Sequence, residues 1–321
     1  MSDRVAALRD AYGEALAELG RTNERIVVLD ADLSPTTKTS IFAKEFPDRF
    51  FDVGVAEANL ISVAAGLASA GKIAFASTFT VFGVEKGLNQ FKQSVAYPRL
   101  NVKLVTTHGG MSVGEDGSSH FCLEDIAIMR SLPHVTVILP ADAIETKAAT
   151  KVIAEYNGPV FMRLSRPKTP LIYDDGYRYE GRDLDFKIGK SLTLRDGKDV
   201  TIVATGLMVA EALRAASDLV KEGIDAGVIN VHTIKPLDRE AILRAARGTG
   251  ALVTVEEHNI IGGLGGAVAE VLVEEAPVPM VRVGIRDTYG ESGPWKELFA
   301  KYGLTAANIA QAAKKVMKRK S

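Results

Sequence analysis

The fold is decided by residues 135–164, VTVILPADAIETKAATKVIAEYNGPVFMRL. The stretch opens and closes with short apolar runs rich in β-branched residues, Val135–Leu139 and Val160–Leu164, which are typical of buried strands. A helical pattern separates them, and two more runs of the same kind come earlier in the chain, at Arg25–Leu29 and Val102–Thr106. Strands that alternate with helices predict a parallel sheet covered by helices.

A second series of strands and helices begins at about Val200, where TIVATG is followed by GVINVHTI, ALVTVEE and MVRVGI. The segment before it, from about residue 172 to residue 195, is polar and irregular and includes YDDGYRYEGRD. We therefore expect two successive three-layer α/β domains with mostly parallel sheets, covering residues 1–180 and 190–321.

The overall composition excludes several classes of partner. Lys and Arg total 39 against 40 for Asp and Glu, so the chain has no large field of one sign to attract nucleic acid or anionic lipid. No segment approaches the roughly 20 apolar residues that span a bilayer, and the N-terminus lacks the apolar core of a signal peptide. A single cysteine, Cys122, excludes an intrachain disulfide framework. We expect a cytoplasmic protein that binds neither nucleic acid nor membrane.

Two glycine-rich segments resemble nucleotide-binding motifs but do not complete them. Gly189-Lys190-Ser191 could end a phosphate-binding P-loop, yet Leu184 occupies the position of the required upstream glycine. Gly262–Gly266 is followed by Val268 where a dinucleotide-binding motif needs its last glycine. We interpret this second segment as a tight turn between a strand and a helix.

Polar side chains follow several of the predicted strands, and in open α/β sheets ligands bind beyond the carboxyl ends of the strands. Glu57 opens an alanine- and glycine-rich helix that runs to about Ala70. The segments concerned are Asp30–Thr36, Phe51–Glu57, Ser77–Phe82, Thr107–His120 and the residues around Arg166.

Five stretches, the first four of which overlap these segments, carry a resemblance to a known family: DADLSPTTKT, VGVAEANLISVAAGLA, ASTFTVF, THGGMSVGEDGSSH and LPADAIE. In this order and at this spacing they resemble the pyrimidine-binding and C-terminal domains of transketolases, over essentially the whole chain. The similarity is closest to split transketolases, whose C-terminal half is a separate polypeptide. The resemblance implies a thiamine diphosphate enzyme, although the Gly-Asp-Gly motif with which such enzymes hold Mg²⁺ and diphosphate is absent from this chain.

The resemblance gives Glu57 the role of activating the cofactor. A carboxyl group hydrogen-bonded to pyrimidine N1′ favours the imino form of the 4′-amino group, which can then take the proton from thiazolium C2. On position alone, Glu57 could equally be an ordinary glutamate at a helix start. Phe79 and Phe82 would form the aromatic wall beside the aminopyrimidine, and Asp32 matches an aspartate that orders the cofactor site between subunits.

The resemblance also assigns the substrate-binding residues. His108 would lie near the phosphate of a sugar phosphate, Asp116 near an acceptor hydroxyl, and His120 near the reacting carbonyl, where it would also be catalytic. Arg166 resembles the phosphate clamp of the family, and Thr36 belongs to the same substrate-binding group. Two histidines without a third ligand make a poor metal site, so we expect no metal ligands in this chain.

We therefore predict the C-terminal subunit of a transketolase, which transfers a two-carbon ketol unit between ketose and aldose phosphates. A separate N-terminal subunit would bind the diphosphate and Mg²⁺ or Ca²⁺, two copies of each subunit would form a heterotetramer, and this chain alone would be inactive. Alternatives are a subunit like 1-deoxy-xylulose-5-phosphate synthase, a 2-oxo-acid dehydrogenase β subunit, and a catalytically dead scaffold. Ala58, Glu85 and Phe121 depart from the usual family pattern and leave the substrate pockets open.

Overall fold

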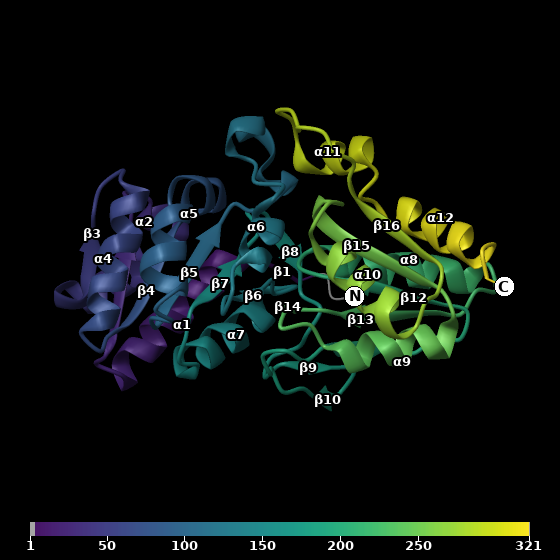
Figure 1. Cartoon of the computed structure of the whole chain (residues 1–321), viewed down its shortest axis with the longest axis horizontal. Helices are drawn as coiled ribbons and strands as arrows, with labels where there is room; N and C mark the ends of the chain where they lie inside the picture. The colour runs from purple at the N-terminus through teal and green to yellow at the C-terminus, as the bar shows by residue number, and fades with distance from the viewer. Residues whose placement is uncertain (1–3, 321) are drawn as a thin grey trace.

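The first domain is built on a seven-stranded sheet with the strand order β14-β6-β7-β5-β4-β2-β3. The computed structural model describes residues 4–320, and Figure 1 shows its two domains side by side. Every strand of this sheet except β14 runs parallel to its neighbours. The strands are β2 (Ile26–Asp30), β3 (Phe50–Asp52), β4 (Ile73–Phe79), β5 (Val102–Thr107), β6 (Thr136–Ile138), β7 (Val160–Arg163) and β14 (Thr233–Lys235).

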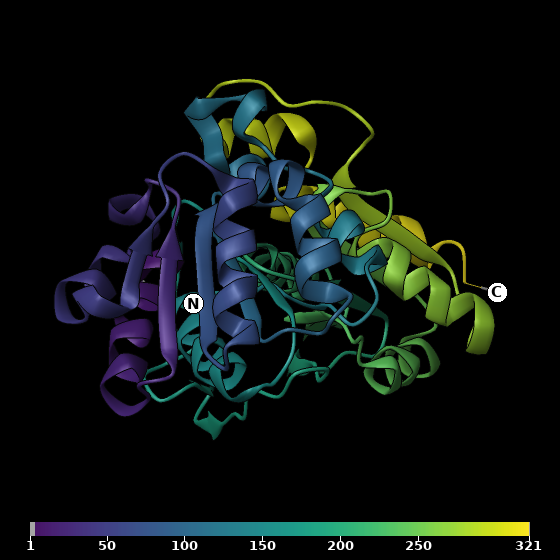
Figure 2. The same ribbon diagram turned by 60° about the vertical axis from the view of Figure 1, so that its left-hand side comes forward.

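Helices cover both faces of this sheet, which explains why its strands are continuous apolar runs. Ile26 and Val28 of β2 enter the core under α1 and α7, whereas Val27 and Leu29 enter the core under α4. Figure 2 shows α4 lying along the sheet. The helices are α1 (Leu8–Thr22), α2 (Ser34–Thr37), α3 (Ser40–Glu45), α4 (Glu57–Ser69), α5 (Leu88–Gln90), α6 (Asp125–Ser131) and α7 (Ala143–Glu155), with π-helical turns at Phe82–Lys86 and Phe91–Ala96 and 3-10 turns at Pro47–Arg49, Met111–Asp116 and Ser118–His120.

The second domain has a five-stranded sheet with the order β11-β13-β12-β15-β16, in which only β11 is antiparallel. Helices α8 and α12 contribute to one of its cores, and α9 and α10 contribute to the other. The elements are β11 (Leu192–Arg195), β12 (Val200–Ala204), α8 (Met208–Lys221), β13 (Ala226–Asn230), α9 (Arg239–Thr249), β15 (Leu252–Asn259), α10 (Leu264–Glu275), β16 (Met280–Ile285), α11 (Trp295–Tyr302) and α12 (Ala306–Met317). The predicted pair of three-layer α/β domains is confirmed.

The two domains share more than a linker. β14 follows the second domain's β13 in sequence, yet it pairs antiparallel with β6 and covers the edge of the first sheet. Nearby, the Asn230 amide donates hydrogen bonds of 2.9 and 3.0 Å to the fully buried carboxyl group of Glu145. Because an unpartnered carboxyl group is costly to bury, these contacts favour one arrangement of the domains.

Short strand pairs complete the described part of the chain. β1 (Val5–Ala7) pairs antiparallel with β8 (Lys168–Pro170), and β9 (Arg178–Tyr179) pairs with β10 (Arg182–Asp183) between the domains. We propose that the domains divide between residues 180 and 190, a stretch that begins within this second pair. None of the helices within residues 4–320 is long and apolar enough to cross a membrane.

Candidate active site

Glu57 is the first residue of α4, and its side chain is buried. The N–H groups in the first turn of a helix have no partner within the helix, so a carboxylate is favoured there. The nearest cation to this carboxylate is an ammonium: Lys86 Nζ lies 3.8 Å from Glu57 Oε2. The ammonium also lies 4.6 Å from the centroid of the Phe82 ring, so Glu57 and Phe82 share Lys86 as a neighbour.

Phe79 and Phe82 form a stacked pair where β4 ends and the next turn begins. Their ring centroids are 5.9 Å apart and the ring planes differ by 16°. Both rings are only partly buried, although they pack on the core beneath α4. The pair therefore keeps apolar surface available at the end of β4, which suits a flat heteroaromatic ring.

The two predicted histidines extend this pair of rings at its two ends. The His108 ring stacks on Phe79 at 3.9 Å, and the His120 ring meets Phe82 edge-on at 5.5 Å. The order His108, Phe79, Phe82, His120 brings together residues from β4 and from the segment after β5. The structure thus unites these four residues with Glu57 in one constellation.

His108 is held as a neutral imidazole. Burial, and then the nearby cations Arg9 and Arg166, lower the pKa of His108 to about 3. Its Nδ1 lies 2.9 Å from the Thr107 hydroxyl, and its backbone has a positive φ of 61° that few residues other than glycine adopt. A neutral ring offers one donor and one acceptor, so His108 can hydrogen-bond a substrate oxygen without adding charge.

Arg166 lines a cavity of about 460 Å³ together with Arg9 and Lys38. Its Nη1 donates to Val113 O at 2.7 Å and to the Glu115 carboxylate at 2.8 Å. Arg9 Nε is buried without a hydrogen-bond partner among the described residues. Lys168 lines the cavity as well, and so do the carboxylates of Asp10 and Glu115, so the cations outnumber the anions and favour an anionic ligand. A buried donor without a partner favours a ligand that can accept a hydrogen bond.

The sequence analysis missed Arg9 and Lys38. Arg9 reaches this cavity because β1 pairs with β8, which joins residues 5–7 to residues 168–170. No local pattern in the sequence predicts that two three-residue strands so far apart in sequence will pair. Lys38 has a signal in the sequence, because it lies two residues after Thr36 within DADLSPTTKT.

Three predicted residues have no described bond to the constellation. Asp32 is exposed with a φ of 62°, and its N–H donates to Asp52 Oδ1. Thr36 is partly buried within α2, and Asp116 is exposed at the end of the turn Met111–Asp116. Within residues 4–320, no hydrogen bond or ion pair connects their side chains to Glu57 or to the rings. Their predicted roles remain proposals.

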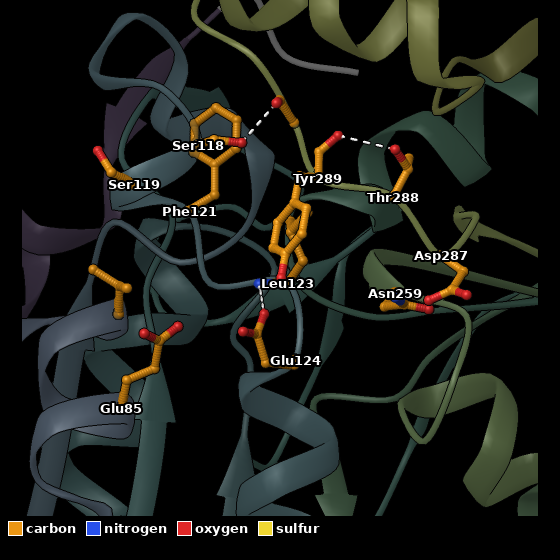
Figure 3. A pocket seen from close by; sticks show the side chains of 12 residues that line it. Glu85, Ser118, Ser119, Phe121, Leu123, Glu124, Asn259, Asp287, Thr288 and Tyr289 are labelled. Carbon is orange, nitrogen blue, oxygen red and sulfur yellow. Dashed lines mark hydrogen bonds between the residues drawn. The ribbon is translucent and has the colours of Figure 1, made fainter.

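A second cavity of about 520 Å³ lies between the two domains and is lined by Ser119 and Phe121, the neighbours of His120 in sequence (Figure 3). Glu85 and Glu124 face it from the first domain, and Asn259 and Asp287 face it from the second. Burial and the neighbouring Glu124 raise the pKa of Glu85. Glu85 thus places a carboxyl group in the wall of this cavity, at a position where the resemblance predicts an aromatic ring.

Comparisons with known proteins agree with this geometry. The family description "Transketolase, pyrimidine binding domain" matches residues 4–171, and "Transketolase, C-terminal domain" matches residues 189–309. A solved structure of a "split gene transketolase, inactive beta4 tetramer" is 51% identical, covers 98% of this chain and 99% of its own, and superposes with a TM-score of 0.91.

Two curated relatives show how the chain relates to whole enzymes. The 6-deoxy-6-sulfo-D-fructose transketolase subunit SqwH of a Clostridium species is 48% identical over 98% of this chain and 95% of its own length. Human transketolase is 38% identical over 98% of this chain, but only 49% of the human protein is matched. The chain belongs to the transketolase family and corresponds to the C-terminal section of a split transketolase.

Proposed function

We propose that this chain is the C-terminal subunit of a thiamine-diphosphate-dependent transketolase, which moves a two-carbon ketol unit from a ketose phosphate to an aldose phosphate. One observation carries the proposal. The buried carboxylate of Glu57 lies 3.8 Å from Lys86 Nζ, and the same ammonium lies 4.6 Å from the centroid of Phe82, whose ring stacks on Phe79 between His108 and His120.

The residues present fit the aminopyrimidine half of the cofactor. Phe79 and Phe82 offer an aromatic wall, and the Glu57 carboxylate offers a hydrogen-bond partner for a ring nitrogen. When it is bound, thiamine diphosphate supplies a thiazolium that stabilises negative charge on the carbon left by carbon–carbon bond cleavage. Lys86, the present neighbour of Glu57, is 56% exposed, so its flexible side chain can leave the carboxylate to the cofactor.

Glu57 would share a proton with pyrimidine N1′. A hydrogen bond at this nitrogen makes the 4′-amino group a better acid and therefore a better proton relay. The position at the start of α4 holds the carboxylate in place, because α4 packs on the sheet along its apolar face. Glu57, Phe79 and Phe82 would thus act on the cofactor, while His108, Asp116, His120 and Arg166 would act on the sugar.

The substrate would extend from His108 and His120 to the cavity lined by Arg9, Lys38 and Arg166. His120 would donate to the reacting carbonyl oxygen, and Asp116 would contact an acceptor hydroxyl. Arg166 and Arg9 would both bind the phosphate, with neutral His108 adding a hydrogen bond. In this structure the Arg166 guanidinium is paired with the Glu115 carboxylate, so binding of a phosphate would require this exposed ion pair to break. Such exposed pairs are weak, at roughly 0–1 kcal/mol.

The diphosphate and its metal ion would be held by an N-terminal transketolase subunit. This chain has no counterpart of the usual Gly-Asp-Gly motif, and apolar side chains near Glu57 are exposed. Phe51 and Val55 lie just before α4, and Tyr97 lies after the π-helical turns. We propose that this surface and the outer face of α4 meet the partner subunit, which would bring Mg²⁺ or Ca²⁺, and that two copies of each subunit assemble in the cytoplasm.

The nature of the donor tests this proposal against its rivals. With an N-terminal transketolase subunit added, we expect xylulose 5-phosphate to be turned over and pyruvate not, because the cations around Arg166 suit a phosphorylated donor. Product formation from each donor, measured with the same aldose phosphate acceptor, decides the matter. Condensation of pyruvate with the aldose phosphate would favour a 1-deoxy-xylulose-5-phosphate synthase type of enzyme, and release of CO2 from pyruvate without that product would favour a 2-oxo-acid dehydrogenase type. No turnover of either donor would favour a scaffold.

A further inference from the structure

Residues 109–120, which we call the substrate loop, leave the first domain after β5 and contact the second domain. The loop follows His108 and carries Asp116 and His120. Figure 1 shows this segment rising toward α11 of the second domain. A loop with two such residues needs a fixed position, because misplacing a catalytic group by about 1 Å can cost 100-fold in rate.

Glu257, in β15 of the second domain, holds the beginning of this loop. Its Oε1 accepts the backbone N–H of Ser112, and both groups are fully or almost fully buried. Arg163 Nη2 donates to Glu257 Oε2 at 3.3 Å, and Arg163 Nη1 donates to Asp125 Oδ1 at 3.2 Å. Burial raises the pKa of Glu257 to about 7 although Arg163 and the Ser112 N–H lower it, so the ionised carboxyl group depends on these partners staying in place and the contact demands one loop position.

Two consecutive glycines show how closely the loop backbone approaches these side chains. A Cβ atom added to Gly109 would lie 2.4 Å from carbon atoms of Arg163, and one added to Gly110 would lie 2.5 Å from the carboxyl carbon of Glu257. Gly110 also has a φ of +79°. No other residue type fits at these two positions while the buried ion pair keeps its place.

The far end of the loop is held by the second domain as well. Ser118 Oγ donates to Gly290 O at 2.6 Å, a contact drawn in Figure 3. At Gly117, an added Cβ atom would lie 2.2 Å from Ser292 Oγ. The two ends of the substrate loop are therefore attached to separate segments of the second domain, β15 and the stretch before α11.

We infer that the C-terminal domain positions the substrate loop, and that Glu257 is the principal positioning residue. The consequence for catalysis rests on the proposed function, whereas the consequence for loop motion does not. Glu57 and Phe79 lie on α4 and β4 and form no hydrogen bond to the second domain within the described residues. Loosening the loop should therefore weaken substrate binding much more than cofactor binding.

The test is the substitution Glu257→Gln, with Glu256→Gln as the matched control. In E257Q the new side chain would still offer an oxygen to the Ser112 N–H, but an amide would face Arg163 instead of a carboxylate. Glu256 is equally buried, yet it accepts the N–H groups of Leu264 and Gly265 inside the second domain and does not touch the loop. Both variants replace one buried carboxyl group, so a general loss of stability would affect both.

Hydrogen–deuterium exchange of the chain alone gives the first readout. We expect E257Q to speed exchange in peptides from residues 109–121 at least tenfold, with residues 57–69 unchanged and with E256Q like the wild type. In the assembled enzyme, E257Q should raise the KM for the ketose phosphate about tenfold and change the Kd for thiamine diphosphate less than twofold. Exchange needs no activity, so an inactive assembly would refute the proposed function alone.

The inference is overturned if E257Q and E256Q give the same exchange in the loop, or if KM and cofactor Kd rise by the same factor. Should E257Q not fold, Ser118→Ala decides instead, because it removes only the partly buried hydrogen bond to Gly290 O. We then expect about threefold faster exchange in residues 115–121. Unchanged exchange in S118A would equally contradict a loop that the second domain holds in place.

Discussion

Glu57→Gln is expected to lower kcat of the assembled enzyme about 1000-fold while leaving the fold intact. Gln keeps the shape of the side chain at the start of α4, but it cannot share a proton with a ring nitrogen as a carboxyl group can. General acid–base groups contribute roughly 100- to 10,000-fold to rates, and 1000-fold corresponds to about 4 kcal/mol. Steady-state ketol transfer gives kcat, and thermal unfolding reports on the fold.

Glu145→Gln is the matched control for this experiment. Glu145 is also a buried glutamate in the first turn of a helix, α7, but it contacts Tyr177 and Asn230 rather than the constellation. Burial raises the pKa of Glu145 to about 7. We expect E145Q to lower the melting temperature and to keep kcat within twofold. A kcat for E57Q within tenfold of the wild type would show that Glu57 is not the activating group.

Arg166→Ala is expected to lower kcat/KM for a phosphorylated ketose about 100-fold. Charge-assisted hydrogen bonds contribute roughly 1.5–3 kcal/mol each, and a guanidinium can donate two of them to one phosphate. Arg166→Lys should recover only part of this loss, because an ammonium cannot reproduce the planar pair of donors. Initial rates with saturating acceptor and varied donor give the required kcat/KM values.

An unphosphorylated ketose provides the internal control for Arg166. The variant and the wild type should process it at nearly equal rates, since the cavity around Arg9, Lys38 and Arg166 would then hold no phosphate. Equal losses with both donors would mean that Arg166 acts instead by fixing the loop through its bond to Val113 O. Arg178→Ala, which removes an exposed arginine between the domains, controls for the loss of a positive charge.

The sequence predicted the fold well because burial leaves a strong signal in strands that are covered on both faces. β2, β5 and β7 are uninterrupted buried runs, and their spacing by helices leaves a parallel sheet as the natural arrangement. β14 could not be predicted in its place, because three residues of the second domain's sequence join the first domain's sheet. Such an assignment depends on the packing of whole domains and not on a local pattern.

The sequence predicted some residues of the candidate site and not others, again because local patterns do not show contacts between distant segments. Glu57, Phe79 and Phe82 lie close to one another in sequence or directly after strands, so sheet topology places them together. Arg9 and Glu257 join the site from distant segments, through the β1–β8 pair and through the contact between domains. Their neighbours in sequence give no indication of these contacts. Asp32 is exposed in the chain alone, and its role between subunits remains a prediction.

The central claim is that this chain holds one half of a shared cofactor site. The most direct test is calorimetric titration of thiamine diphosphate with Mg²⁺ into the chain alone and into its mixture with an N-terminal transketolase subunit. We predict no tight binding to the chain alone and tight binding to the mixture, accompanied by ketol transfer. Tight binding to the chain alone would mean that it contains a diphosphate site of its own, and would contradict the division of the site between two subunits.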